Sequence, residues 1–142
     1  MAMASDATMG TLKRRIDSDQ DFHNPGVVKV TTDREGYALY FSRAPIPLVR
    51  DDPKRAAVPG LHFIHLGLYI YTRETLQRLT ALPTGTLEDA EKLEQLRALE
   101  NGIRIRVWET AHGSLRIDSP EDVPGALEQL RTRATGLGIT QP

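Results

Sequence analysis

The chain has 142 residues, of which 39% are apolar and 26% charged, and its formal net charge is −1. This length predicts one domain with a real core, and the near-neutral charge argues against general binding to nucleic acid or to an anionic membrane. The absence of cysteine excludes disulfides, thiolate metal sites and a cysteine nucleophile. No stretch approaches the roughly 18 apolar residues of a membrane span, and the first residues lack the apolar core of a signal peptide, so we expect a soluble, cytoplasmic protein.

Residues 1–23 are small, polar and charged. We expect a partly disordered extension here, unless residues 11–16 pair with the edge of a sheet. The basic run Lys13-Arg14-Arg15 is interpreted as part of a solvated arm.

Two short runs with strand character follow a turn at Asn24-Pro25-Gly26. Residues 27–32 are rich in β-branched side chains, and residues 37–42 resume the pattern after a polar break, so we predict two strands joined by a tight connection. Residues 43–60 contain four prolines and many charges. They predict a long loop, which in a compact domain tends to carry function.

Residues 62–71 form the clearest strand pattern of the chain. Alternation places His65 and Tyr69 on one face and the aliphatic side chains on the other, so we expect the aliphatic face to be core and the His-Tyr face to look into a cleft. Because His62 and His65 point to opposite faces, a shared zinc ion is not expected.

The next segments alternate between helix and strand signals. Residues 73–82 predict a short amphipathic helix with Leu76, Leu79 and Leu82 inward. Residues 86–102 predict one longer helix, capped by Thr86 and Gly102, whose apolar residues recur every third position and spread over half the cylinder.

The C-terminal part carries a third strand signal and a last helix signal. Residues 103–108 alternate at period two, and Ser119 with Pro120 predicts the start of a helix after a short strand at residues 115–117. The whole pattern predicts an α/β fold, with helices packed against a mixed sheet.

Three side chains attract attention before any family is considered. Asp118 lies between a strand end and a helix start, where α/β proteins collect ligands and divalent ions. It is equally explained as a second capping acid beside Ser119, and both explanations stay open. Arg43 and Arg50 flank the proline-rich loop, where guanidinium groups can hold carboxylates or phosphates.

The sequence resembles the 3-deoxy-manno-octulosonate cytidylyltransferases, the CMP-KDO synthetases of lipopolysaccharide synthesis. Five segments occur in the order seen in that family and cover most of the chain from residue 11 to residue 130. They are Asn24–Val30, Ala38–Pro47, His65–Tyr71, Leu93–Gly102 and Asp118–Asp122. They match only the C-terminal half of that enzyme, so residues 24–136 are interpreted as a sugar-binding and dimer-forming half, followed by a tail at 137–142.

The resemblance implies a nucleotide-diphospho-sugar transferase-like fold, usually a homodimer, that uses CTP and Mg²⁺ to make CMP-KDO and pyrophosphate. It implies that Asp118 is a Mg²⁺ ligand. It also implies that five residues line a sugar-acid pocket: Arg43, His65, Tyr69, Glu94 and Gln95. An arginine suits the sugar carboxylate, and the other four suit a polyol.

The departures from the family leave other functions open. The family's N-terminal half, with its triphosphate loop and second metal-binding Asp, has no counterpart here. Arg116 stands close to Asp118 and would crowd or repel a metal ion. The leading hypothesis is therefore the C-terminal part of a CMP-KDO synthetase, whether by truncation, gene splitting or an incomplete gene model, which binds KDO weakly and does not bind CTP. If the gene is split, a separate N-terminal half is a further partner. The alternatives are a non-catalytic dimerisation or interaction module and a related transferase for another sugar acid.

Overall fold

The computed structural model describes residues 7–52, 57–111, 120, 123–128 and 130. The chain divides into two compact units, residues 1–112 and residues 113–142, and each is described by itself. In the second unit, residues 123–128 are helical. The predicted strand at 115–117, Asp118 and Ser119 lie outside the described residues.

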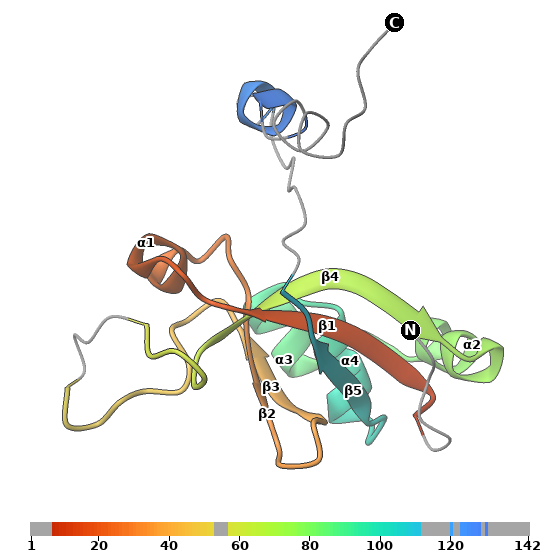
Figure 1. Cartoon of the computed structure of the whole chain (residues 1–142). Helices are drawn as coiled ribbons and strands as arrows, with labels where there is room; N and C mark the ends of the chain where they lie inside the picture. The colour runs from red at the N-terminus through yellow and green to blue at the C-terminus, as the bar shows by residue number, and fades with distance from the viewer. Residues whose placement is uncertain (1–6, 53–56, 112–119, 121–122, 129, 131–142) are drawn as a thin grey trace, which may run out of the picture. The chain divides into compact units, whose positions relative to one another are not determined.

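The first unit is built on one five-stranded sheet in the order β3-β2-β4-β1-β5 (Figure 1). Its strands are β1 (Met9–Arg15), β2 (Lys29–Thr32), β3 (Ala38–Ser42), β4 (Phe63–Tyr71) and β5 (Ile105–Glu109). The β1 and β5 strands are parallel, and the other neighbours are antiparallel. The predicted mixed α/β sheet is therefore confirmed.

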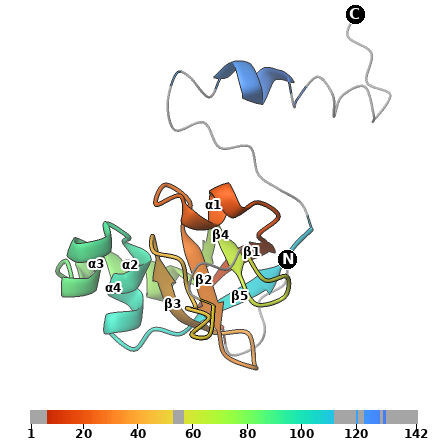
Figure 2. The same cartoon turned by 90° about the vertical axis from the view of Figure 1, so that its left-hand side faces the viewer.

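Four short helices accompany the sheet: α1 (Asp19–His23), α2 (Arg73–Ala81), α3 (Thr86–Glu91) and α4 (Gln95–Glu100). Figure 2 shows α2, α3 and α4 grouped on one side of the sheet. The larger core cluster lies there, where Met9, Phe41 and Ile105 of the strands pack with Leu79 and Leu96 of the helices.

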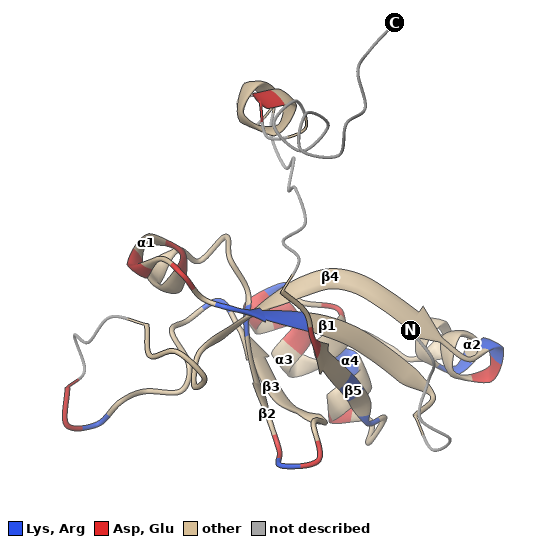
Figure 3. Cartoon of the chain, in the orientation of Figure 1, with Lys and Arg blue, Asp and Glu red and all other residues tan. Residues whose placement is uncertain are grey.

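Within the extension expected at residues 1–23, the exception made for sheet pairing applies. Residues 9–15 form β1, which pairs with β4 on one side and with β5 on the other, so the segment does pair with the sheet but lies inside it rather than at its edge. The basic run is not a solvated arm either (Figure 3). Lys13 is buried, with its ammonium 4.0 Å from the centre of the Phe63 ring and 2.7 Å from the Thr32 hydroxyl, while Arg14 and Arg15 pair with acids.

The single helix predicted over 86–102 is also wrong. Lys92 adopts a left-handed conformation, with φ 53° and ψ 49°, and separates α3 from α4. The N-cap of α3 is Gly85 rather than Thr86, and the Glu88 carboxylate accepts the Gly85 amide. Lys92 pairs with Asp89, while Glu88 pairs with Arg97 of α4 at 2.5 Å.

The two faces of β4 differ from the prediction as well. His65, Tyr69 and Tyr71 face the larger core cluster, whereas Ile64 and Leu66 belong to a smaller cluster with Phe22 of α1. Leu68 is 59% exposed, so the aliphatic face is core over only part of its length. On α2, Leu79 is buried as expected, but Leu76 is exposed.

The turn between β2 and β3 folds over the far edge of β5. The Val107 amide donates to the Gly36 carbonyl at 2.8 Å, and Tyr37 forms an isolated antiparallel bridge with Arg106. The guanidinium of Arg104 also lies over the Tyr37 ring, 3.6 Å from the ring centre. These contacts attach the β2–β3 hairpin to β5.

Candidate functional site

His65 and Tyr69 lie on the core side of β4, next to an irregularity in its pairing with β1. Leu12 pairs with Leu66 but Thr11 pairs with Tyr69, so β4 carries two extra residues at this point. The ring centres of His65 and Tyr69 are 5.3 Å apart, and the ring centre of Phe41 is 4.9 Å from that of His65. The predicted neighbourhood of His65 and Tyr69 is therefore present in the structure.

The hydroxyl of Tyr69 is buried and has no hydrogen-bond partner among the described residues. Burial raises the pKa of this hydroxyl well above its ordinary value of 10, and the nearby Glu94 carboxylate and Tyr71 raise it further. Because an unpaired buried hydroxyl costs free energy, its retention points to a partner that the described residues do not supply.

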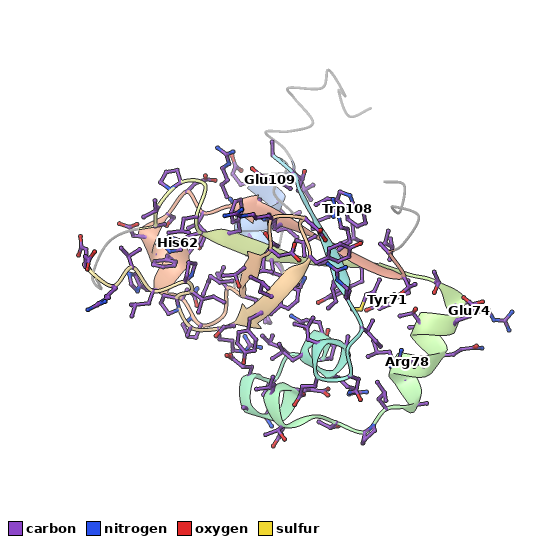
Figure 4. All side chains as sticks on the ribbon, turned by 90° about the horizontal axis from the view of Figure 1, so that it is seen from below. His62, Tyr71, Glu74, Arg78, Trp108 and Glu109 are labelled. Atoms are coloured by element: carbon purple, nitrogen blue, oxygen red, sulfur yellow. The ribbon has the colours of Figure 1, made fainter. Side chains whose placement is uncertain are left out.

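Tyr71 belongs to the same neighbourhood, although the sequence did not single it out. Its ring stacks on Tyr69 with centres 5.8 Å apart. Burial raises its pKa, and Glu94 raises it further. Figure 4 shows Tyr71 at one end of β4, beside α2, with His62 at the other end.

Glu94 and Gln95 are presented by the break between α3 and α4. Glu94 is the N-cap position of α4 and is exposed, whereas Gln95 begins the helix and is 2% exposed. The left-handed Lys92 turns the chain so that Leu93 and Leu96 enter the core on either side of this pair. Glu94 acts electrostatically on both tyrosines of β4, so two of the predicted pocket elements meet here.

Arg43 also contacts the break between α3 and α4. Its Nε donates to the Glu91 carbonyl at 2.8 Å, and its two terminal nitrogens donate to the carbonyls of Pro25 and Lys92 at 3.0 and 3.3 Å. The guanidinium therefore ties the end of β3 to the turn that carries Glu94. In this structure Arg43 has a positioning role.

Two residues missed by the sequence analysis complete this framework. Glu91 accepts the Ser42 hydroxyl at 2.6 Å and the Arg43 amide at 2.9 Å. Lys29 is fully buried and donates to the carbonyls of Asn24, Val27 and Arg43. Burial lowers the pKa of Lys29, with Glu91 opposing that shift and Arg43 adding to it. A charged residue inside a strand pattern was the available signal, because such a residue is buried only when it is paired.

His62 and His65 are on different faces, as predicted. The His62 ring lies 4.3 Å from the Phe22 ring; its Nδ1 accepts the Val58 amide, and its Nε2 lies 3.0 Å from the Pro47 carbonyl. This histidine fixes both ends of the proline-rich loop. Arg50 is exposed.

No group of three His, Cys, Asp or Glu side chains that could hold a metal occurs among the described residues. The predicted ligand Asp118 lies outside them. In the part of the chain that the structure describes, no helix is both long enough and apolar enough to cross a membrane.

Comparison with known proteins decides the family. A family model described as cytidylyltransferase matches residues 2–105. The chain belongs to the cytidylyltransferase family. Among curated members, the 3-deoxy-manno-octulosonate cytidylyltransferase of Geobacter sulfurreducens is 54% identical over 129 residues, covering 87% of this chain and 52% of the relative. That of Solibacter usitatus is 54% identical over 118 residues, covering 83% of this chain and 45% of the relative.

A solved structure agrees with the cytidylyltransferase assignment. The CMP:2-keto-3-deoxy-manno-octonic acid synthetase complexed with CTP is 36% identical, with a TM-score of 0.75, and the match covers 92% of this chain and 50% of that one. The family resemblance and the fold class are thus confirmed. The chain spans about half the length of the cytidylyltransferases that it matches.

Proposed function

We propose that this chain provides the sugar-acid-binding part of an enzyme that forms CMP-KDO and pyrophosphate from CTP and 3-deoxy-manno-octulosonate. The observation that carries the proposal is the buried, unpaired hydroxyl of Tyr69 beside Glu94. A polyol supplies both donors and acceptors, so one sugar hydroxyl can accept from the phenol while another donates to the carboxylate.

The proposed division of labour is that these residues bind the sugar acid and that the nucleotide-binding half of the family binds CTP. The chain spans about half of the relatives named for this activity, so the reaction also requires that other half, whether or not it belongs to the same polypeptide. Residues 24–136 then form the C-terminal half, in a homodimer in the cytoplasm.

In the proposed reaction the anomeric hydroxyl of the sugar acid attacks the α-phosphorus of CTP in line, and pyrophosphate leaves. The chain's own contribution is orientation, which lowers the barrier because the attacking oxygen no longer has to find its geometry by diffusion. Tyr69 and Glu94 bind sugar hydroxyls beside His65 and Gln95, and Arg43 and Glu91 hold the break from which Glu94 projects.

Mg²⁺ would neutralise charge on the triphosphate when bound. The described residues do not form a donor set for it, so no step is assigned to the ion. Asp118 remains a proposed single ligand, and Arg116, two positions before it in the sequence, is unfavourable for a cation.

Calorimetric titration of the whole chain with KDO and with CTP separately tests the proposal. We expect weak binding of KDO and none of CTP, because the triphosphate loop of the family has no counterpart in this sequence. Binding of CTP without binding of KDO would overturn it.

Tyr69→Phe tests the site itself. Removing the hydroxyl should weaken KDO binding about tenfold, which corresponds to one hydrogen bond of ordinary strength, and should leave folding intact because this hydroxyl has no partner in the structure. Tyr40→Phe, a half-buried tyrosine on β3, is the matched control and should bind KDO like the parent chain.

A non-catalytic interaction module is the second candidate function. It is favoured by large apolar side chains that are exposed on the sheet and the helices, among them Leu39 at 63%, Leu68 at 59% and Leu76 at 45%. Self-association of a chain that binds neither substrate would support this candidate over the first.

A further inference from the structure

The hydroxyl of Thr11 sits at the irregularity between β1 and β4. Thr11 is fully buried, and its Oγ1 lies 2.8 Å from the Leu68 carbonyl, 3.1 Å from the Leu66 carbonyl and 3.0 Å from Nε2 of His65. Extra residues in one strand leave backbone groups that the ladder cannot pair. The Thr11 hydroxyl therefore offers a hydrogen-bond donor to the Leu66 and Leu68 carbonyls at this irregularity.

The count of protons at this junction fixes the direction of each hydrogen bond. A threonine hydroxyl has one proton, and the carbonyls of Leu66 and Leu68 can only accept. The Thr11 proton is therefore directed to the carbonyls, and the Thr11 oxygen is left to accept from Nε2 of His65. A neutral His65 then carries its proton on Nε2, and its acceptor nitrogen is Nδ1.

We propose that Thr11 is a positioning residue that sets the tautomer and the orientation of the His65 ring in the sugar-acid site. Phe41 and Tyr69 pack against that ring, with ring centres 4.9 and 5.3 Å from its own. Thr11 adds a polar contact at Nε2, and this contact distinguishes the two ring nitrogens. The role toward the sugar acid rests on the proposed function, whereas the tautomer does not.

The tautomer is measured directly by long-range ¹H–¹⁵N correlation spectra of the imidazole rings in the whole chain. His62 is an internal reference, because the backbone amide of Val58 can only donate to its Nδ1, at 2.8 Å, and so requires the proton on Nε2. We expect His65 to give the same Nε2–H pattern as His62, with its signals assigned by their loss in His65→Gln. An Nδ1–H pattern for His65 in the parent chain overturns the inference, whatever any variant does.

Thr11→Val and Thr11→Ser then test the hydroxyl. Valine keeps the shape and removes the hydroxyl, so the His65 pattern should shift toward a mixture of tautomers while that of His62 stays unchanged. Serine keeps the hydroxyl and should restore the parent pattern. An unchanged His65 pattern in a folded Thr11→Val chain overturns the inference; if that variant does not fold, the parent and Thr11→Ser spectra decide.

KDO titrations of the same variants separate this inference from the proposed function. Thr11→Val should bind KDO about tenfold more weakly than the parent chain, and Thr11→Ser within about twofold. A parent chain that binds no KDO refutes the proposed function, while the spectra still support or overturn the role of Thr11 in the tautomer.

Discussion

A single unpaired hydroxyl is the sharpest functional signal at the scale of residues. Tyr69 keeps its proton because burial, and then Glu94, raise its pKa, so the phenol is a hydrogen-bond donor throughout the range in which proteins are usually assayed. The neighbouring Glu94 is exposed at the start of α4. One buried donor next to one exposed acceptor suits a ligand that is partly enclosed and has many hydroxyls.

Gly10 is the residue whose replacement should disturb the sheet most directly. A Cβ at this position would lie 2.3 Å from the Trp108 ring and 3.2 Å from Ile70. Gly10→Ala should lower the free energy of unfolding by about 1–3 kcal/mol, as overpacking usually does. Urea unfolding measures this loss.

Gly67→Ala is the matched control on the neighbouring strand, because a Cβ there meets nothing within 4 Å. It should change the free energy of unfolding by less than about 0.5 kcal/mol. Equal losses for the two variants would contradict the assigned contact between Gly10 and Trp108.

The break between α3 and α4 is the central feature at the scale of elements. In a continuous helix, apolar residues at every third position drift around the axis by about 60° per step, so they cannot all face one core. The left-handed turn at Lys92 ends one helix, so the next helix can turn a different set of side chains toward the core. Leu93, Leu96 and Ala98 are buried after this turn, while Leu87 before it is 38% exposed. The price of that turn is backbone strain at a residue with a side chain.

Lys92→Gly should relieve that strain. Because a left-handed residue other than glycine costs about 1 kcal/mol or more, the glycine variant should be more stable by roughly 0.5–1 kcal/mol after its greater freedom in the unfolded chain is subtracted. Lys92→Ala also loses the pair with Asp89 but keeps a Cβ, so it should show no gain. Thermal unfolding of the two variants distinguishes strain from charge.

The ion pair between α3 and α4 predicts that the stability of the fold depends on pH in the acid range. The hydrogen bond from Arg97 is the main reason that the pKa of Glu88 lies below its ordinary value of 4.5. The pair's stabilisation is therefore complete above pH 4.5 and is lost as the pH falls through the lowered pKa. Unfolding by urea at pH 7 and pH 3 should show a smaller difference for Glu88→Gln than for the parent chain.

The sequence predicted elements with a clear period and missed those decided by tertiary contacts. The β4 and β5 strands follow alternation, whereas β2 and β3 were predicted from runs of strand-forming residues, and all four were predicted within a few residues. The β1 strand was foreseen only as an exception, because Lys13, Arg14 and Arg15 hide its pattern, although Lys13 is buried against Phe63. The wrong choice of core face on β4 has a similar cause, because the rings of Tyr69 and Tyr71 pack on the core although tyrosine also has a polar hydroxyl.

The candidate site could be predicted only in part from the sequence. Strand alternation placed His65 and Tyr69 on one face, but only the family resemblance added Glu94 and Gln95 and joined all four residues in one site. Thr11, Lys29 and Glu91 could not be found in this way, because their roles come from carbonyls and amides that only the folded backbone brings to them.

At the scale of the whole molecule, the chain spans about half of the relatives it matches. The isolated chain should therefore form no CMP-KDO from CTP and KDO. Addition of a polypeptide carrying the first half of the Geobacter sulfurreducens relative should yield detectable pyrophosphate release, and the same mixture with Tyr69→Phe should yield less. Turnover by the isolated chain would contradict the proposed division of labour.

The hydrogen bond between Gly36 and Val107 has a consequence for how this polypeptide behaves at high concentration. An outer strand with open amides invites identical molecules to stack into fibrils. Here the hairpin tip occupies the Val107 amide, and Arg104 and Arg106 place positive charge along the same margin. Loosening that hairpin should therefore expose the free edge of β5 and favour aggregation.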